Sequence, residues 1–219
     1  MTDLHDYISN DFKAFNSQET IASVQDFLAD LHFSHFPVME EGVFIGSISA
    51  DDIETFDSDK KIIDYKYTLD HFFARKNMIW LDVLEVFAKN HTNLIPILDE
   101  KNTYIGYYEI EDIMKFFHET PFLKEQGGII IVKKGLLDYT MSEITQIVES
   151  NNARILGLFI SEADAVTVEI TIKISMGSIN EIIQTFRRYD YEIISEHQED
   201  NYLKNLQERS DYLDKYLNI

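Results

Sequence analysis

The fold is decided by residues 20–56, TIASVQDFLADLHFSHFPVMEEGVFIGSISADDIETF, because their pattern returns in residues 79–117, IWLDVLEVFAKNHTNLIPILDEKNTYIGYYEIEDIMKFF. Pro37 corresponds to Pro96. After one extra residue in the second copy, Gly46 corresponds to Gly106. In both copies an aspartate follows the glycine by six residues. Repetition at a fixed period indicates two copies of one supersecondary unit.

Each copy predicts the order helix, strand, strand, helix. Apolar residues recur at helical spacing at the start of each copy, from Ile21 to Leu31 and from Trp80 to Phe87. The apolar runs around Pro37 and around its counterpart in the second copy predict short strands. Proline cannot donate a ladder hydrogen bond, so we expect each proline at a sheet edge or at the start of its strand.

This pattern resembles the CBS module, named after cystathionine β-synthase. The family's marks are an apolar-Pro-Val strand, a glycine followed by an ending such as Ser49-x-x-Asp52, and the tandem arrangement. The resemblance implies a CBS pair over residues 1–122, with repeats at about 15–57 and 74–118. We expect extended lead-ins to the two modules at Tyr7–Phe15 and Tyr65–Met78.

A second unit is predicted over residues 127–198. A buried strand is expected from Gly127, and a strict alternation of apolar and polar residues from Val166 to Ile174 predicts a half-buried strand. The other elements expected are a helix with Met141, Ile144 and Val148 on one face, a strand over Ile155–Ile160, a helix with Ile179, Ile182, Ile183, Phe186 and Tyr189 on one face, and a last strand over Tyr191–Ser195. The order βαββαβ is ferredoxin-like, so the fold class of the chain is α/β (α+β).

The second unit resembles an ACT domain, an amino-acid-sensing module. The family usually carries a glycine at the start of its first helix, and Tyr139 falls in that slot, where it would crowd a ligand. Residues 199–219 predict an amphipathic C-terminal helix, because Leu203, Leu206, Leu213 and Leu217 share one face. Such a face should pack on its own chain or on a partner.

The CBS resemblance implies a site for an adenosyl nucleotide beside the Ser49-x-x-Asp52 ending. There the hydroxyl and the following helix start would meet phosphate, and the carboxylate would accept hydrogen bonds from the ribose hydroxyls. The candidate residues are Phe15, His35, Phe36, Pro37, Ser49 and Asp52. The alternative is that Ser49 and Asp52 form a capping box that needs no ligand. We expect Asp52→Ala to abolish binding and Asp112→Ala to matter less.

A weaker second site is predicted at Ile95, Pro96, Glu109 and Asp112. Glu109 stands where the family has Ser or Thr, and a carboxylate there repels phosphate. This site is therefore expected to bind an uncharged adenosyl group or nothing, and the alternative is a solvated helix start. His32 and His35 could form a metal pair, but a third ligand at suitable spacing is missing. We expect no metal site and interpret His35 as a strand-edge residue that could border the cleft.

Composition narrows the classes of function. The chain has 19 Lys+Arg against 39 Asp+Glu, a net charge of −20, which disfavours binding to nucleic acid and to anionic membranes. It has no cysteines. Neither a signal sequence nor an apolar run of membrane-spanning length is found, so a cytoplasmic location is expected by default. No catalytic motif is found, and we expect no enzyme. A third hypothesis is an enzyme that holds magnesium with Asp51-Asp52 and Glu111-Asp112. Adjacent residues at a helix start point in different directions, so each pair would be a poor chelate.

The leading hypothesis is a regulatory protein that senses an adenosine-containing ligand and passes the signal to an unknown protein partner or to its own oligomeric state. The resemblance implies AMP, ADP, ATP or S-adenosylmethionine as regulatory ligand, with no cofactor. The alternative is an interaction or scaffold protein with degenerate CBS sites. We also expect a homodimer, because CBS pairs and ACT-like domains tend to pair with copies of themselves.

Overall fold

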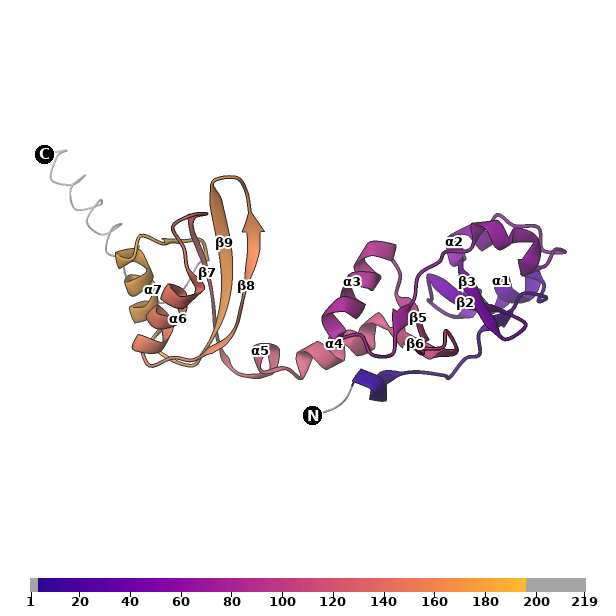
Figure 1. Ribbon diagram of the computed structural model, residues 1–219, viewed down its shortest axis with the longest axis horizontal. Coiled ribbons are helices and arrows are strands. Elements are labelled where there is room, and N and C mark those ends of the chain that lie inside the picture. Colours follow the sequence, from indigo (N-terminus) through magenta and orange to yellow (C-terminus); the bar gives the residue numbers. More distant parts are fainter. Residues whose placement is uncertain (1–3, 196–219) are drawn as a thin grey trace, which may run out of the picture. The chain divides into compact units, whose positions relative to one another are not determined.

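The computed structural model describes residues 4–195, and the chain divides into two compact units at Phe117 and His118 (Figure 1). Both units mix helices with sheets, so the predicted α/β class is confirmed. The helix predicted over 199–219 lies outside the described residues. No helix between residues 4 and 195 is long and apolar enough to cross a membrane.

The first unit contains the predicted repeat. Each copy forms a three-stranded sheet in which a short strand runs parallel to the first strand of an antiparallel hairpin. The first copy consists of β1 (Phe15–Asn16), α1 (Ile21–Asp30), β2 (His35–Glu40), β3 (Val43–Ser49) and α2 (Ala50–Ile53). The second consists of β4 (Ala74–Arg75), α3 (Trp80–Asn90), β5 (Leu94–Leu98), β6 (Tyr104–Glu109) and α4 (Ile110–His118). The 3-10 segments η1 (Leu4–Tyr7) and η2 (Ile62–Thr68) precede the two copies.

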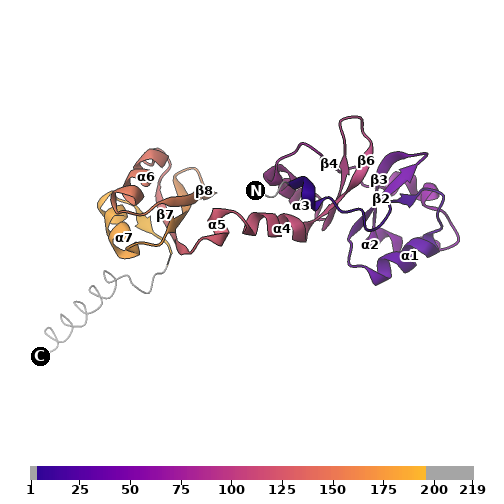
Figure 2. The same cartoon turned by 90° about the horizontal axis from the view of Figure 1, so that it is seen from below.

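The helix α1 shows why this sequence folds locally as predicted. Thr20 caps it by accepting a hydrogen bond from the backbone N–H of Ser23 at 3.4 Å. Ile21, Val24 and Leu28 form its buried face. Figure 2 shows α1 beside α2, and the side chain of Gln25 joins them by donating to a backbone carbonyl of α2.

The positions predicted for the two prolines are wrong. Pro37 is the third residue of β2, the central strand of its sheet, and pairs with Ser47. The backbone N–H and C=O of Ser47 pair with Asp70, so they point away from β2. Pro37 therefore lies in a non-hydrogen-bonded pair, and on its other side β1 begins to pair only at Val38. The proline nitrogen therefore removes no hydrogen bond from the ladder. Pro96 of β5 repeats this arrangement in the second copy.

The two lead-ins cross between the copies. Ser9, in the lead-in to the first copy, exchanges backbone hydrogen bonds of 2.9 and 3.0 Å with Tyr107 of β6 in the second copy. Asp70, in the lead-in to the second copy, exchanges bonds of 2.8 and 2.9 Å with Ser47 of β3 in the first. Leu4 is buried in the core of the second copy. Each copy is thus completed by a segment that precedes the other.

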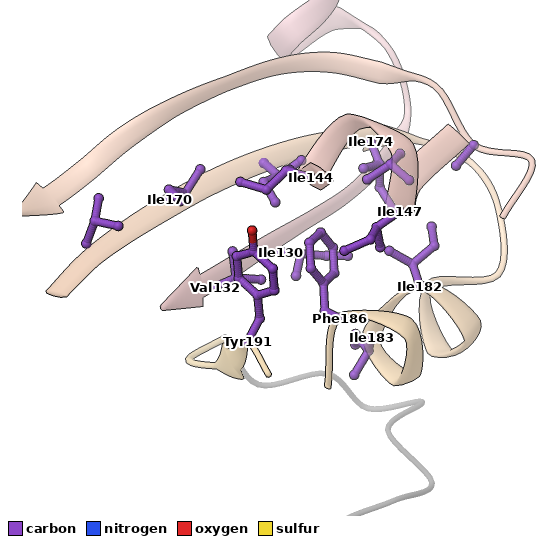
Figure 3. Close-up of a cluster of buried hydrophobic side chains, with 14 residues drawn as sticks. Ile130, Val132, Ile144, Ile147, Ile170, Ile174, Ile182, Ile183, Phe186 and Tyr191 are labelled. Carbon is purple, nitrogen blue, oxygen red and sulfur yellow. The ribbon is translucent and has the colours of Figure 1, made fainter. Parts of the chain in front are cut away.

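The second unit consists of α5 (Pro121–Lys124), β7 (Gly127–Gly135), α6 (Met141–Ser150), β8 (Ile155–Ala163), β9 (Thr167–Ser175), α7 (Ile179–Arg188) and β10 (Glu192–Ile193). After α5 the order is the predicted βαββαβ. The strands form one antiparallel sheet in the order β10-β7-β9-β8. The helices α6 and α7 cover one face of this sheet, where isoleucines from strands and helices fill the core (Figure 3).

Three predicted details of this unit are wrong. Val166 is 71% exposed, because Asp164 accepts hydrogen bonds from the N–H groups of Val166 and Thr167 and so forms a turn before β9. Tyr189 is 46% exposed, since it ends α7 as the C-cap instead of continuing its buried face. The last strand is only Glu192–Ile193.

Candidate functional site

The predicted first site is built on the short helix α2. Ser49 is its N-cap, and its hydroxyl oxygen accepts a hydrogen bond from the backbone N–H of Asp52 at 3.5 Å. This is the geometry of the capping alternative. Asp52 is exposed, and α2 has four residues. A ligand that used the Ser49 hydroxyl would have to replace or share this contact.

The aromatic and proline candidates of the first site belong to the core. Phe15 is 5% exposed and Phe36 is fully buried, and their rings pack against each other with centroids 5.0 Å apart. Pro37 is buried too. In the second copy Ile95 is fully buried and Pro96 is buried. The side chains of these five residues fill the cores, so a contact with ligand would have to come from their backbone, and their role in binding stays a prediction.

His35 begins β2 and contacts a carboxylate that the sequence analysis did not select. Its Nε2 lies 3.2 Å from Oδ2 of Asp70, and its Nδ1 lies 3.1 Å from the hydroxyl of Ser34. Burial lowers the pKa of His35, and the carboxylates of Asp70, Asp51 and Asp52 only partly oppose this effect. The ring is therefore neutral at pH 7, with Nε2–H donating to Asp70. Between residues 4 and 195, no group of three or more His, Asp or Glu side chains is arranged to hold a metal ion.

A pair of polar residues joins the two copies beside this histidine. The backbone N–H of Ser34 donates to Oδ1 of Asn93 at 2.9 Å, and the backbone N–H of Asn93 donates to the Ser34 hydroxyl at 3.1 Å. These residues precede β2 and β5 respectively. The bonds hold the starts of the two central strands together.

A hollow of about 330 Å³ opens at the start of α4, and residues of both copies line it. Such a volume is at the lower end of the range for small-molecule sites. The lead-in and first copy supply Phe12, Leu31, His32 and Phe33, and the second copy supplies Asn93, Glu109, Ile110 and Glu111. Its lining is thus partly aromatic and partly polar, a combination that suits a flat heterocycle with a polar substituent.

The electrostatics of this hollow are anionic. Burial raises the pKa of Glu109, and the neighbouring carboxylates of Asp112, Glu111 and Asp11 raise it further. Lys115 opposes the shift, but its Nζ is engaged with Oδ1 of Asp112 at 2.9 Å. A second negative charge placed here would be repelled.

Another hollow, of about 320 Å³, lies between α1 and α2. Its lining comes from the first copy alone and includes Ala50 and Glu54 but neither Ser49 nor Asp52. The structure therefore brings residues of both copies together around Glu109, where the sequence predicted the weaker site.

Sequence reasoning missed most of the lining of the hollow at Glu109. Phe12, Leu31 and Phe33 were not selected, and His32 was considered only as a metal ligand. The residues lie far from the second motif in sequence and reach it only because the copies pack together. Phe12 lies in the predicted lead-in. An aromatic residue in that segment was the one signal in the sequence that could have indicated a contribution to the hollow.

Comparisons with known proteins agree with the repeat. Residues 4–58 and 68–119 match the family model of the CBS domain. An uncharacterized protein of Methanocaldococcus jannaschii is 24% identical over 138 residues, which cover 60% of this chain and 50% of that protein. The chain thus spans about half the length of this curated relative.

Two solved structures that resemble about half of the chain contain CBS domains or bind AMP by their descriptions. A CBS domain pair/ACT domain protein from Thermotoga maritima has 18% identity and a TM-score of 0.49, covering 54% of this chain and 98% of that one. CBSX2 in complex with AMP has 13% identity and a TM-score of 0.45, covering 53% and 96%. The two segments matched by the family model, with the repeated sheets and crossed lead-ins, form a tandem pair of CBS domains.

Proposed function

We propose that this chain is a regulatory protein whose CBS pair senses an adenosine-containing ligand in the hollow beside Glu109. The observation that supports this most is that side chains of both CBS domains line one hollow. A ligand that touches both domains binds differently when the domains move apart. Binding would therefore bias one arrangement of the pair, which is the requirement for a regulatory signal.

The proposed ligand carries an adenosyl group with a neutral or positively charged substituent. Phe12 and Phe33 offer aromatic surface for a purine. The carboxylates around Glu109 disfavour phosphates and favour a cation. We therefore expect S-adenosylmethionine or adenosine to bind more tightly than AMP, ADP or ATP.

A thermal-shift screen of the full chain against these five compounds tests the proposal. A ligand present at one hundred times its dissociation constant should add about 2.7 kcal/mol to the free energy of unfolding. The shift should survive in Asp52→Ala and shrink in Asp112→Ala, because Asp112 lies beside Glu109. A loss confined to Asp52→Ala would place the site at Ser49 instead, as the sequence predicted. If none of the compounds shifts the melting temperature, the proposal fails.

The second candidate function is a scaffold protein that binds no small ligand. It is favoured by Ser49, whose hydroxyl serves as a helix cap, and by the carboxylate at Glu109. It predicts a protein partner in pull-downs and stability that no nucleotide changes. Stoichiometric binding of an adenosyl ligand by calorimetry would exclude it.

We further propose that the second unit is an ACT-like domain that does not bind an amino acid, and that the chain forms a homodimer. Tyr139 precedes Thr140, the N-cap of α6, and its side chain packs against the core of the unit. In this proposal Tyr139 stands at the position where the family usually has a glycine. Light scattering at micromolar concentration tests the dimer, and a full-length monomer would contradict it.

A further inference from the structure

Ser34 and Asn93 occupy equivalent positions of the repeat, 59 residues apart, and they meet where the two copies join. Each also fixes a helix start in its own copy. The Ser34 carbonyl accepts from the backbone N–H of Ala50, and the Asn93 carbonyl accepts from the N–H of Ile110. The side-chain amide of Asn93 donates to the carbonyl of His32 as well. We call the bonds that join Asn93 to Ser34 and His32 the clamp.

The two halves of the clamp differ in the residue that follows each of them. His35 follows Ser34, whereas Leu94 follows Asn93. Nδ1 of His35 lies 3.1 Å from Oγ of Ser34, and the same oxygen lies 3.1 Å from Oδ1 of Asn93. A titratable ring therefore contacts the clamp in the first copy, and an aliphatic side chain stands in its place in the second.

The hydroxyl of Ser34 has one proton and more than one acceptor within reach. The neutral ring of His35 carries its proton on Nε2, so its Nδ1 can accept. Oδ1 of Asn93 can also accept, beside the bond that it takes from the backbone N–H of Ser34 at 2.9 Å. Oγ1 of Thr92 lies farther away, at 3.2 Å, and already accepts from the N–H of Leu94. The single proton therefore serves either His35 or Asn93 while the ring is neutral.

Protonation of the ring removes this competition. Nδ1 of His35 then carries a proton and donates to Oγ of Ser34. The Ser34 hydroxyl is left free to donate to Oδ1 of Asn93. The protonated state thus has one more hydrogen bond than the neutral state, and the added bond joins the two copies. The bond from the charged ring is also of the stronger kind.

Three carboxylates face the ring from two elements. Asp70 lies in the lead-in to the second copy, with its Oδ2 3.2 Å from Nε2 of His35, and Asp51 and Asp52 belong to α2. Burial lowers the pKa of His35, and the three carboxylates oppose this effect in part. The bond that protonation adds at Ser34 acts in the same direction as the carboxylates, so its loss should weaken proton binding further.

We propose that this chain of hydrogen bonds is a proton-operated switch, in which a proton on His35 tightens the clamp between the two CBS domains. The clamp holds His32 and Asn93, and both line the hollow beside Glu109. The switch would therefore act on the shape of that hollow. It belongs to the CBS pair itself and does not require the ligand proposed above.

The proton affinity of His35 in the full chain tests the switch. NMR titration of the seven histidines measures it, and the spectrum of His35→Gln assigns the resonance. Asn93→Ala should lower the affinity about two- to tenfold, the equivalent of one hydrogen bond. In a chain that also carries Ser34→Ala, the same substitution should change it less than about twofold, because the coupling passes through the Ser34 hydroxyl. The matched control Asn90→Ala removes an amide that bonds within α3 and should leave the affinity unchanged.

Asn93→Asp is the second variant, and it applies if Asn93→Ala does not fold, because it keeps the acceptor and adds a charge. It should raise the proton affinity of His35, and the rise should be larger with the Ser34 hydroxyl than without it. Circular dichroism checks the fold of each variant. Effects of the Asn93 substitutions that are the same in both backgrounds, or absent from both, would overturn the switch. Failure of every adenosyl compound in the thermal-shift screen would remove the proposed ligand and leave these expectations unchanged.

Discussion

Gly106→Ala should destabilise the first unit far more than Gly42→Ala, although both glycines have positive φ. At Gly106 φ is +141°, and an added Cβ would lie 2.5 Å from the carbonyl oxygen of Ser9 and 2.7 Å from Cγ2 of Ile8. The Ser9 oxygen belongs to the backbone pair with Tyr107, so it cannot move without breaking that pair. At Gly42 φ is +83° and no atom lies within 4 Å of the added Cβ.

The loss of stability expected for Gly106→Ala has three contributions. Forcing alanine into this backbone conformation costs about 1–3 kcal/mol, and overpacking against the lead-in costs about 1–3 kcal/mol. Each weakened hydrogen bond between Ser9 and Tyr107 adds about 0.5–1.5 kcal/mol. With the two bonds of this pair, even the low ends of these contributions sum to about 3 kcal/mol, so a loss of at least about 3 kcal/mol is expected at Gly106. At Gly42 only the backbone term remains, about 1–2 kcal/mol.

Urea denaturation followed by tryptophan fluorescence measures the free energy of unfolding of the two variants. The chain has one tryptophan, Trp80, which lies in the first unit and stacks on Phe117, so its emission reports unfolding of that unit. Gly106→Ala should also weaken ligand binding, because the segment it displaces leads directly to Phe12. Equal losses of stability in the two variants would refute the argument that the lead-in is clamped against β6.

Three further predictions concern stability. Phe36→Ala, at a fully buried ring, should cost about 3–5 kcal/mol, whereas Val43→Ala, at a side chain 59% exposed, should change stability by less than about 0.5 kcal/mol in the same urea assay. The pKa of Glu109 is raised above 4.5 in the folded chain, so its ionisation opposes folding. Glu109→Gln should therefore be more stable than wild type at pH 7, and the difference in stability should close as the pH falls from the raised pKa to 4.5. The pKa of His35 is lowered from 6.5, so the unfolded chain binds the proton more readily; stability should fall as pH drops below about 6.5, and His35→Gln should show a weaker dependence in melting curves.

The sequence was sufficient for the order of elements because the repeat and the apolar periods are local signals. Two copies aligned on Pro37 and Pro96 predicted the same helix and strands twice, and both copies fold that way. The error on the prolines has a different origin. A strand's place in its sheet, and the side on which its ladder bonds lie, depend on partners such as Asp70 that are distant in sequence.

The candidate site was less predictable for the same reason. Motif spacing identified Ser49 and Glu109 as residues that precede helices, and both do. The contribution of Phe12 and Phe33 to the hollow beside Glu109 comes from packing between copies, which no local pattern encodes. The aromatic residues that resembled ligand contacts, Phe15 among them, were needed in the core.

Calorimetric titration of the full chain with S-adenosylmethionine and with ATP, repeated on Phe12→Ala, tests the central proposal most directly. Phe12 lines the hollow and is 36% exposed, so its removal should reduce binding without unfolding the domain. We expect saturable binding of S-adenosylmethionine, weaker binding of ATP, and an affinity for S-adenosylmethionine at least about tenfold lower in Phe12→Ala. ATP binding that is tighter than that of S-adenosylmethionine and unchanged in Phe12→Ala would contradict the proposed site beside Glu109.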